Sequence, residues 1–315
     1  MVNPAATDRF VGIGPVYPMV TPFTSDEAID EPGVGRYLDH LIDRGASCVL
    51  VTAGTSRFNL LDHDEVNRLN VVTVKAAAGR CRVIAATPMI GSFRQIEASA
   101  QFAADAGADA VMVLYTERYY GDEPVVAFFS TLADRCRAPV MIHANPMRNA
   151  LGIDGGARDY TIGLVKRLAD HANIVGIKEE CSSKHRAYEV IRGSSGKILN
   201  IPAGGSMRKY LLDAHVGAQT YLTGVGNVFP EIEETFFRCV KSGDWPRAEA
   251  IVRDFEDPVF EAFFRIGWHT ALKSALAQIG VMEPYERRPL TPPTDVQVGE
   301  IRRVVEELKT KMASL

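Results

Sequence analysis

The sequence predicts a closed (β/α)8 barrel followed by a helical extension, and three observations carry this prediction. Apolar runs rich in valine and isoleucine alternate with amphipathic segments along most of the chain. Between residues 10 and 242 the repeats average about 29 residues, an ordinary length for one strand and its helix. After residue 242 the alternation stops and helical patterns follow one another. Eight strand–helix units in succession favour a closed barrel.

Eight segments are expected to form parallel strands. Most of them are continuous apolar runs, which is the pattern of strands covered by helices on their outer side. They are residues 14–21, 48–52, 82–86, 110–115, 140–144, 174–178, 198–202 and 218–223.

Helices are expected between these strands, and several helix ends carry sequence signals. One segment opens with Pro32 and stops before Gly45, which places proline at the helix start and glycine beyond its end. Asp62 precedes another helix, and Asp64 and Glu65 put negative charge into its first turn. The predicted helices are residues 32–44, 63–78, 92–106, 123–135, 160–169, 184–192, 207–214 and 230–241.

An open, doubly wound sheet is the alternative architecture. Such a sheet would place a glycine fingerprint after its first strand, where this chain has Val20-Thr21-Pro22-Phe23. The sequence also contains no P-loop pattern. Both observations favour the barrel.

The last part of the chain predicts three helices without strands between them, at residues 245–264, 268–279 and 294–312. A proline-rich link from Pro284 to Pro293 precedes the last helix. We expect residues 8–243 to form the barrel and residues 244–315 to form an extension packed on it, because about 70 residues is near the lower size at which a core is self-sufficient.

Composition and charge exclude several classes of protein. Hydrophobic residues make up 46% and charged residues 23% of the chain, as in a globular protein with a large core. The 35 basic and 39 acidic residues give a net charge of −4, which offers no basic face for nucleic acid or for an anionic membrane. No apolar run is long enough to span a membrane, and no signal peptide is apparent.

Cysteine and histidine spacing indicates neither disulfides nor a metal site. The five cysteines are far apart and include no C-x-x-C pair, so a reducing cytoplasm is the expected compartment. The seven histidines show no H-x-x-x-H spacing, and we therefore expect no bound metal.

Lys178 is the first candidate for chemistry, because it closes an apolar strand at the barrel end where active sites lie. Burial there would lower the pKa of its amine and free the neutral form as a nucleophile toward a ketone. A lysine that reaches to the rim or pairs with Glu179 or Glu180 is the plainer interpretation, and position alone favours it.

Other strand ends carry further candidates. The adjacent hydroxyls of Thr55 and Ser56 follow the second strand, where they can bind a carboxylate or simply form a turn. His143 ends the fifth strand and is either an acid–base group or a core histidine. Arg148 can grip a carboxylate with two hydrogen bonds or lie solvated in a loop.

The order of these features resembles the dihydrodipicolinate synthase and N-acetylneuraminate lyase family of class I, Schiff-base aldolases. The resemblance covers essentially the whole chain, and the separation of His143 and Lys178 is close to that between the family's catalytic tyrosine and lysine. Its motifs are Val20-Thr21-Pro22-Phe23, Gly54-Thr55-Ser56, Asn145-Pro146-Met147-Arg148 and Val175-Gly176-Ile177-Lys178-Glu179.

The resemblance implies that Lys178 forms a Schiff base with pyruvate or another 2-keto acid, without a cofactor. It implies that Thr55 and Ser56 bind the carboxylate and relay protons, and that Arg148 holds the carboxylate of a second substrate, an aldehyde. Gly204 and Thr220 fall near positions that line the family's pocket.

The resemblance also implies a homotetramer made of two dimers. The family's second tyrosine, which reaches across a dimer interface, could correspond to Tyr115, Tyr119 or Tyr120.

Two departures from the family pattern concern the site. After the second strand the family reads Gly-Thr-Thr-Gly-Glu, where this chain has Arg57 and Phe58 in place of the last two residues. His143 stands where the family has its proton-shuttling tyrosine, and the two side chains differ by about 3.5 units in reference pKa.

Three functions follow as hypotheses. The first is a dihydrodipicolinate synthase-like lyase that joins or cleaves pyruvate and a carboxylated aldehyde, which Arg148 favours. The second is an aldolase or dehydratase of a sugar-acid-derived 2-keto acid, which the exchange at His143 favours. The third is a catalytically silent keto-acid-binding barrel, and the cost of burying Lys178 without use argues against it.

Overall fold

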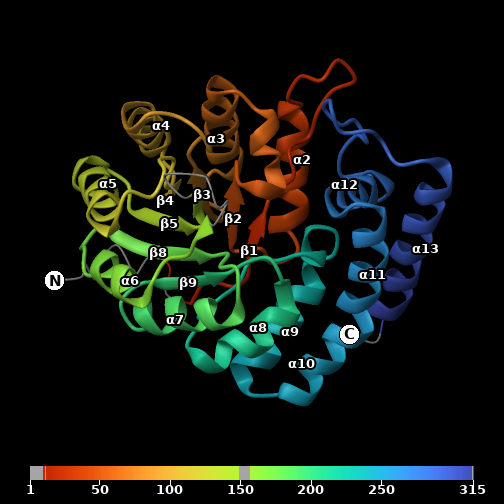
Figure 1. The fold of residues 1–315 in the computed structure, drawn as a ribbon. Coiled ribbons are helices and arrows are strands. Elements are labelled where there is room, and N and C mark those ends of the chain that lie inside the picture. Colours follow the sequence, from red (N-terminus) through yellow and green to blue (C-terminus); the bar gives the residue numbers. More distant parts are fainter. Residues whose placement is uncertain (1–9, 11, 149–156, 314) are drawn as a thin grey trace.

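The computed structural model describes residues 10, 12–148, 157–313 and 315. Seven parallel strands form one sheet in the order β1-β2-β3-β4-β5-β8-β9, and helices surround it on the outside (Figure 1). The strands are β1 (Val16–Pro18), β2 (Cys48–Val51), β3 (Arg82–Ala86), β4 (Ala110–Leu114), β5 (Val140–Ala144), β8 (Ile174–Glu179) and β9 (Leu199–Pro202).

The eighth predicted strand, residues 218–223, closes the ring but is reduced to a single bridge. Leu222 pairs with Val16, and the Leu222 amide donates to the Pro202 carbonyl at 2.9 Å. The Thr223 amide donates to the Val16 carbonyl at 2.9 Å. The next bond of this ladder would need an N–H at Pro18, which proline lacks, so the strand goes no further. The segment still joins β9 to β1, and the predicted barrel is confirmed.

A short antiparallel pair after β5 was not predicted. It consists of β6 (Met147–Arg148) and β7 (Ala157–Arg158), with Met147 opposite Arg158.

The predicted helices are present, with ends that differ by a few residues. Side chains at Asp62 and Ser92 accept from the third backbone amide of their helices, and Glu65 and Gln95 complete the two capping boxes. The first helix starts one residue earlier than expected, because Asp30 caps it. The helices are α2 (Glu31–Ile42), α3 (His63–Ala77), α4 (Phe93–Ala106), α5 (Asp122–Arg135), α6 (Ile162–Ala169), α7 (Lys184–Ser194), α8 (Ser206–Asp213) and α9 (Pro230–Ser242).

The extension contains four helices where three were expected. A π-helical turn at Val252–Glu256 divides the first predicted helix into α10 (Trp245–Ile251) and α11 (Asp257–Ile266). Pro258 has no N–H for the Asp254 carbonyl, which instead accepts from Lys311 at 3.1 Å. The other two helices are α12 (Trp268–Gln278) and α13 (Asp295–Met312).

The extension stands at one side of the barrel, and α11, α12 and α13 pack on one another (Figure 1). We propose the boundary between barrel and extension near Gly243, because α9 ends at Ser242. Among the described residues, no helix combines the length and apolar character that crossing a membrane requires.

Apolar side chains fill the inside of the barrel as well as the layer between strands and helices. The interior cluster includes Cys48, Leu50, Ile84, Met112 and Met141, all buried. A barrel of eight strands is just wide enough for such side chains to fill. The interior is therefore a packed core, and a site has room only at the strand ends.

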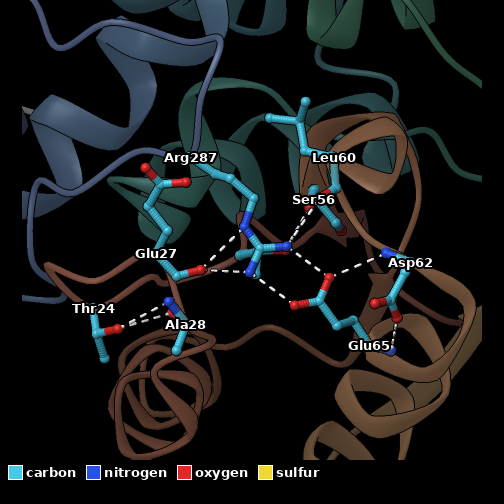
Figure 2. Close-up of polar contacts among 9 residues, drawn as sticks. Thr24, Glu27, Ala28, Ser56, Leu60, Asp62, Glu65 and Arg287 are labelled. Carbon is cyan, nitrogen blue, oxygen red and sulfur yellow. Dashed lines mark hydrogen bonds and ion pairs between the residues drawn. The ribbon is translucent and has the colours of Figure 1, made fainter.

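The link from Pro284 to Pro293 fastens the loops that follow β1 and β2 through Arg287 (Figure 2). The Arg287 guanidinium donates to the backbone carbonyl of Glu27 at 3.1 Å and to that of Leu60 at 2.9 Å. It also pairs with the Glu65 carboxylate at 2.6 Å, and its side chain is only 14% exposed. Arg287 thus holds two loops and a helix start together at one point.

Replacing Arg287 with alanine should lower the free energy of unfolding by about 2–4 kcal/mol, because two carbonyls and a half-buried carboxylate lose a charged donor. Chemical denaturation measures this. The matched control is Arg137→Ala, which removes an exposed arginine paired with the exposed Asp105. An exposed pair of this kind contributes less than about 1 kcal/mol. Equal effects of the two substitutions would contradict the fastening role of Arg287.

Candidate active site

Lys178 lies near the carboxyl end of β8, at the end of the barrel where sites form, and it is 2% exposed. It pairs across the sheet with His143 of β5, which is also buried. The strands therefore place an amine and an imidazole side by side.

A one-residue shift between β5 and β8 makes this pairing possible. Val140 pairs with Ile174, but Met141 pairs with Gly176, so β8 carries one extra residue. Side chains alternate along a strand, and such a bulge reverses which residues face inward beyond it. A Cβ at Gly176 would come within 3.0 Å of the Met141 side chain, which explains the glycine there. Beyond the bulge, Lys178 faces the interior beside His143.

The Glu180 carboxylate completes a triangle with these two groups, which we call the Lys178–His143–Glu180 triangle. The Lys178 Nζ lies 2.7 Å from the His143 Nε2 and 2.8 Å from the Glu180 Oε1. The His143 Nε2 lies 2.6 Å from the Glu180 Oε2, which also accepts from the Asn145 amide at 3.2 Å. Three titratable groups therefore touch one another pairwise.

Of the two glutamates considered as partners of Lys178, only Glu180 contacts it. Glu179 is buried on the other face of the strand, where it accepts from the Cys181 amide at 2.6 Å and pairs with Lys209. Side chains alternate along an extended chain, so residues 178 and 180 lie on the same face. This alternation is the sequence signal that selects Glu180 over Glu179 as the partner of Lys178.

Burial and charge shift all three pKa values in the triangle. Burial lowers the pKa of the Lys178 amine, although the Glu180 carboxylate acts in the opposite direction. Burial and the charge of Lys178 lower the pKa of His143. Burial acts to raise the pKa of Glu180, but Lys178 and His143 outweigh it and bring that pKa well below its usual range. The triangle thus holds one carboxylate between two bases that lose their protons easily.

Thr55 and Ser56 lie at the same end of the barrel, in the 3-10 turn Gly54–Ser56 that follows β2. The Ser56 hydroxyl is fully buried and donates to the Met19 carbonyl at 2.6 Å. The Thr55 side chain is partly exposed. Of these two hydroxyls, that of Ser56 already donates to a backbone carbonyl, whereas that of Thr55 is the better placed to donate to a ligand.

Arg57 explains how the turn keeps its shape without the family's glycine. Arg57 has a φ of 62°, in the left-handed region that glycine adopts most easily. Its buried guanidinium donates to the Thr55 carbonyl at 3.1 Å, to the His269 Nδ1 at 2.7 Å and to the Glu286 carboxylate at 2.7 Å. These contacts offset the backbone strain, and the last two come from the C-terminal extension.

Lys273 of α12 is linked to the same turn through Thr21. Its buried amine donates to the Thr21 carbonyl at 3.0 Å and lies 3.6 Å from Glu286. The Thr21 hydroxyl in turn donates to the Ser56 carbonyl at 2.5 Å. Burial lowers the pKa of Lys273 to about 8 despite the nearby carboxylate.

The remaining predicted site residues are Arg148, Gly204 and Thr220. The backbone of Arg148 lies in β6, and its side chain is outside the described part of the structure. Gly204 is exposed in the turn after β9, with a φ of +76°. The Thr220 hydroxyl donates to the Gly14 carbonyl at 2.6 Å, ahead of β1 and thus at the amino end of the barrel.

The three candidate tyrosines lie in and beside the loop after β4. Tyr115 is buried, Tyr119 donates to the Asp122 carboxylate at 2.8 Å, and Tyr120 is exposed. Tyr115 also lines a cleft of about 250 Å³ together with Asn145. Among the described residues, no group of three or more histidine, cysteine or acidic side chains has the arrangement of a metal site.

Comparison with known proteins gives the fold and the family. In structure, the chain is similar to dihydrodipicolinate synthase from Aquifex aeolicus, with a TM-score of 0.82 and 24% identity over 94% of this chain and 98% of that one. It is also similar to the Escherichia coli K12 prophage protein YagE in complex with pyruvate, with a TM-score of 0.82 and 21% identity over 95% and 99%. These likenesses confirm the barrel.

Among curated proteins, the chain is 28% identical to a 4-hydroxy-tetrahydrodipicolinate synthase from Halorhodospira halophila, over 93% of this chain and 96% of that protein. It is 27% identical to a probable 5-dehydro-4-deoxyglucarate dehydratase from Streptomyces avermitilis, over 90% of this chain and 83% of that protein. The model of the dihydrodipicolinate synthetase family matches residues 12–308. The chain therefore belongs to the dihydrodipicolinate synthetase family.

Proposed function

We propose that this protein is a lyase of the class I aldolase type, in which Lys178 forms a Schiff base with pyruvate or another 2-keto acid. The observation that carries the proposal is a buried amine at the carboxyl end of the barrel, in contact with an imidazole and a carboxylate. Burial favours the neutral, nucleophilic amine, and the neighbours offer places for its protons. The imine then serves as the electron sink, so no other cofactor is required.

The other residues have supporting roles in this proposal. His143 moves protons at the reacting centre, in place of the family's tyrosine. Thr55 binds the keto-acid carboxylate by donating a hydrogen bond from its hydroxyl. The Ser56 hydroxyl already donates to the Met19 carbonyl, so it can act only as an acceptor in a proton relay. Arg148 holds the carboxylate of the aldehyde, and Gly204 lines the pocket. Thr220 has no role in this proposal, because its hydroxyl already donates to the Gly14 carbonyl.

Synthesis from pyruvate and aspartate semialdehyde is the first candidate reaction. Relatives named 4-hydroxy-tetrahydrodipicolinate synthase and the presence of Arg148 support it. The second candidate is a dehydratase or aldolase of a sugar-acid-derived 2-keto acid. The relative named as a dehydratase and the exchange of tyrosine for His143 support that reaction. A silent binding barrel fits poorly with three titratable groups held in contact.

We infer a homotetramer, a dimer of dimers, in the cytoplasm. The five cysteines are all free, in keeping with a reducing compartment. The cleft beside Tyr115 lies in the region where the family resemblance expects a subunit contact.

Borohydride should trap pyruvate on Lys178 and on no other lysine. Because the lowered pKa frees the neutral amine below the usual range of lysine, trapping should persist at neutral pH. Intact mass and peptide mapping detect the adduct. Lys178→Arg should abolish it, whereas Lys197→Arg, at an exposed pair with Asp170, should not. A wild-type protein without an adduct on Lys178 would refute the Schiff-base proposal.

A substrate screen separates the two reactions. Pyruvate with aspartate semialdehyde should give turnover in a coupled assay if the protein is a synthase. Failure with that pair, together with cleavage or dehydration of longer 2-keto acids, would assign the second reaction instead.

His143→Phe should slow turnover more than it slows trapping of the imine, because the Glu180 carboxylate still contacts Lys178 when the ring nitrogens are gone. Proton transfer by a placed side chain contributes about 10²–10⁴-fold to rate, and phenylalanine keeps the volume while it removes the ring nitrogens. Stopped assays of turnover and of borohydride trapping give the two rates. A turnover rate unchanged by His143→Phe would mean that His143 is only a packing residue.

A further inference from the structure

We propose that Glu180 is a catalytic residue, whose carboxylate acts together with His143 to take up the proton that Lys178 must lose before it attacks a 2-keto acid. The proposal rests on the function proposed above and adds a residue to its chemistry. The observations that carry it are the short contacts within the triangle and the position of the Glu180 backbone.

The backbone fixes Glu180 between the two bases. Its amide donates to the Ala144 carbonyl at 3.1 Å, so the loop after β8 is tied to the end of the strand that carries His143. Each carboxylate oxygen then has its own partner, Oε1 at 2.8 Å from Lys178 and Oε2 at 2.6 Å from His143. One carboxylate therefore bridges the nucleophile and the imidazole.

The number of protons available to His143 shows how the Glu180 carboxylate assists the transfer from Lys178. The His143 Nε2 lies 2.7 Å from Lys178 and 2.6 Å from Glu180, yet this atom carries at most one proton. It accepts when Lys178 is an ammonium, and it donates to Glu180 when the proton has moved onto the ring. The second state leaves Lys178 as a neutral amine. The contacts thus describe two positions of one proton.

The chemistry of imine formation uses this pair twice and leaves it unchanged. The Lys178 ammonium first gives one proton to the Glu180–His143 pair, and the nitrogen lone pair then bonds to the keto carbon as the carbonyl π electrons move to oxygen. The pair returns its proton to that oxygen. A second proton passes from nitrogen through the pair to the hydroxyl, which leaves as water while the C=N bond forms. Ammonium and ketone thus become a protonated imine and water.

A different role for Glu180 makes the opposite prediction. If the carboxylate only balanced the charge of the buried ammonium, its removal would leave more of Lys178 neutral and would speed the attack. Among the described residues, the side chains in contact with Glu180 are Lys178 of β8, His143 of β5 and Asn145, which directly follows β5. Glu179 and Lys209 also act on the charge of Lys178, from the outer face of the strand.

The test measures how fast borohydride-trappable adduct forms with pyruvate, in rapid-quench experiments over a range of pH. Glu180→Gln should slow adduct formation about 10²-fold, the contribution of one placed acid–base group. Glu189→Gln is the matched control, because it makes the same change of net charge at an ion pair of α7 with Arg186. It should keep the wild-type rate.

A second variant guards against a folding defect. Glu180→Ala leaves space for a small carboxylate, so added formate should restore part of its rate, whereas Glu180→Gln fills that space and should not respond. Adduct formation in Glu180→Gln as fast as in the wild type, or faster, would overturn the proposal, and so would a lack of rescue in Glu180→Ala. A wild-type protein that forms no adduct would instead overturn the proposed function, and this proposal with it.

Discussion

The one-residue shift between β5 and β8 is the constraint on which the rest of the site depends. Without it, His143 would pair with Ile177, and Lys178 would turn outward to the layer where Glu179 meets α8. Because side chains alternate along strands, the extra residue in β8 determines that Lys178, and not Glu179, faces the interior of the barrel. The close approach of Gly176 to Met141 is the local condition for that shift.

Two groups of buried charges in the structure follow the same physical rule. A charge in a low-dielectric interior is tolerated only when opposite charges and hydrogen bonds surround it. At the triangle, Glu180 meets this need for Lys178. At the turn after β2, Glu286 meets it for Arg57 and Lys273. The barrel supplies the first group alone, but the second needs the C-terminal extension.

Most of the fold could be predicted from the sequence, because apolar runs and helix caps are local signals. What could not be predicted depends on distant partners. Pro18 cuts the eighth strand to one bridge only because that strand lies beside β1. The contact of Glu180 requires the bulge, and Arg57 keeps its left-handed backbone through residues more than 200 positions away. Lys178 and His143 could be selected as candidates from their strand ends, but Thr220 falls at the opposite end of its strand segment.

The fastening of the first loops by the last part of the chain has a consequence for folding. The turn at Thr55 and the loop after β1 receive Lys273, Glu286 and Arg287 only when α12 and the link that follows it are present. Such contacts between distant parts of a chain close late, because a long loop must be ordered first. We therefore expect the turn at Thr55 and the loop after β1 to reach their final form later than the strands of the barrel.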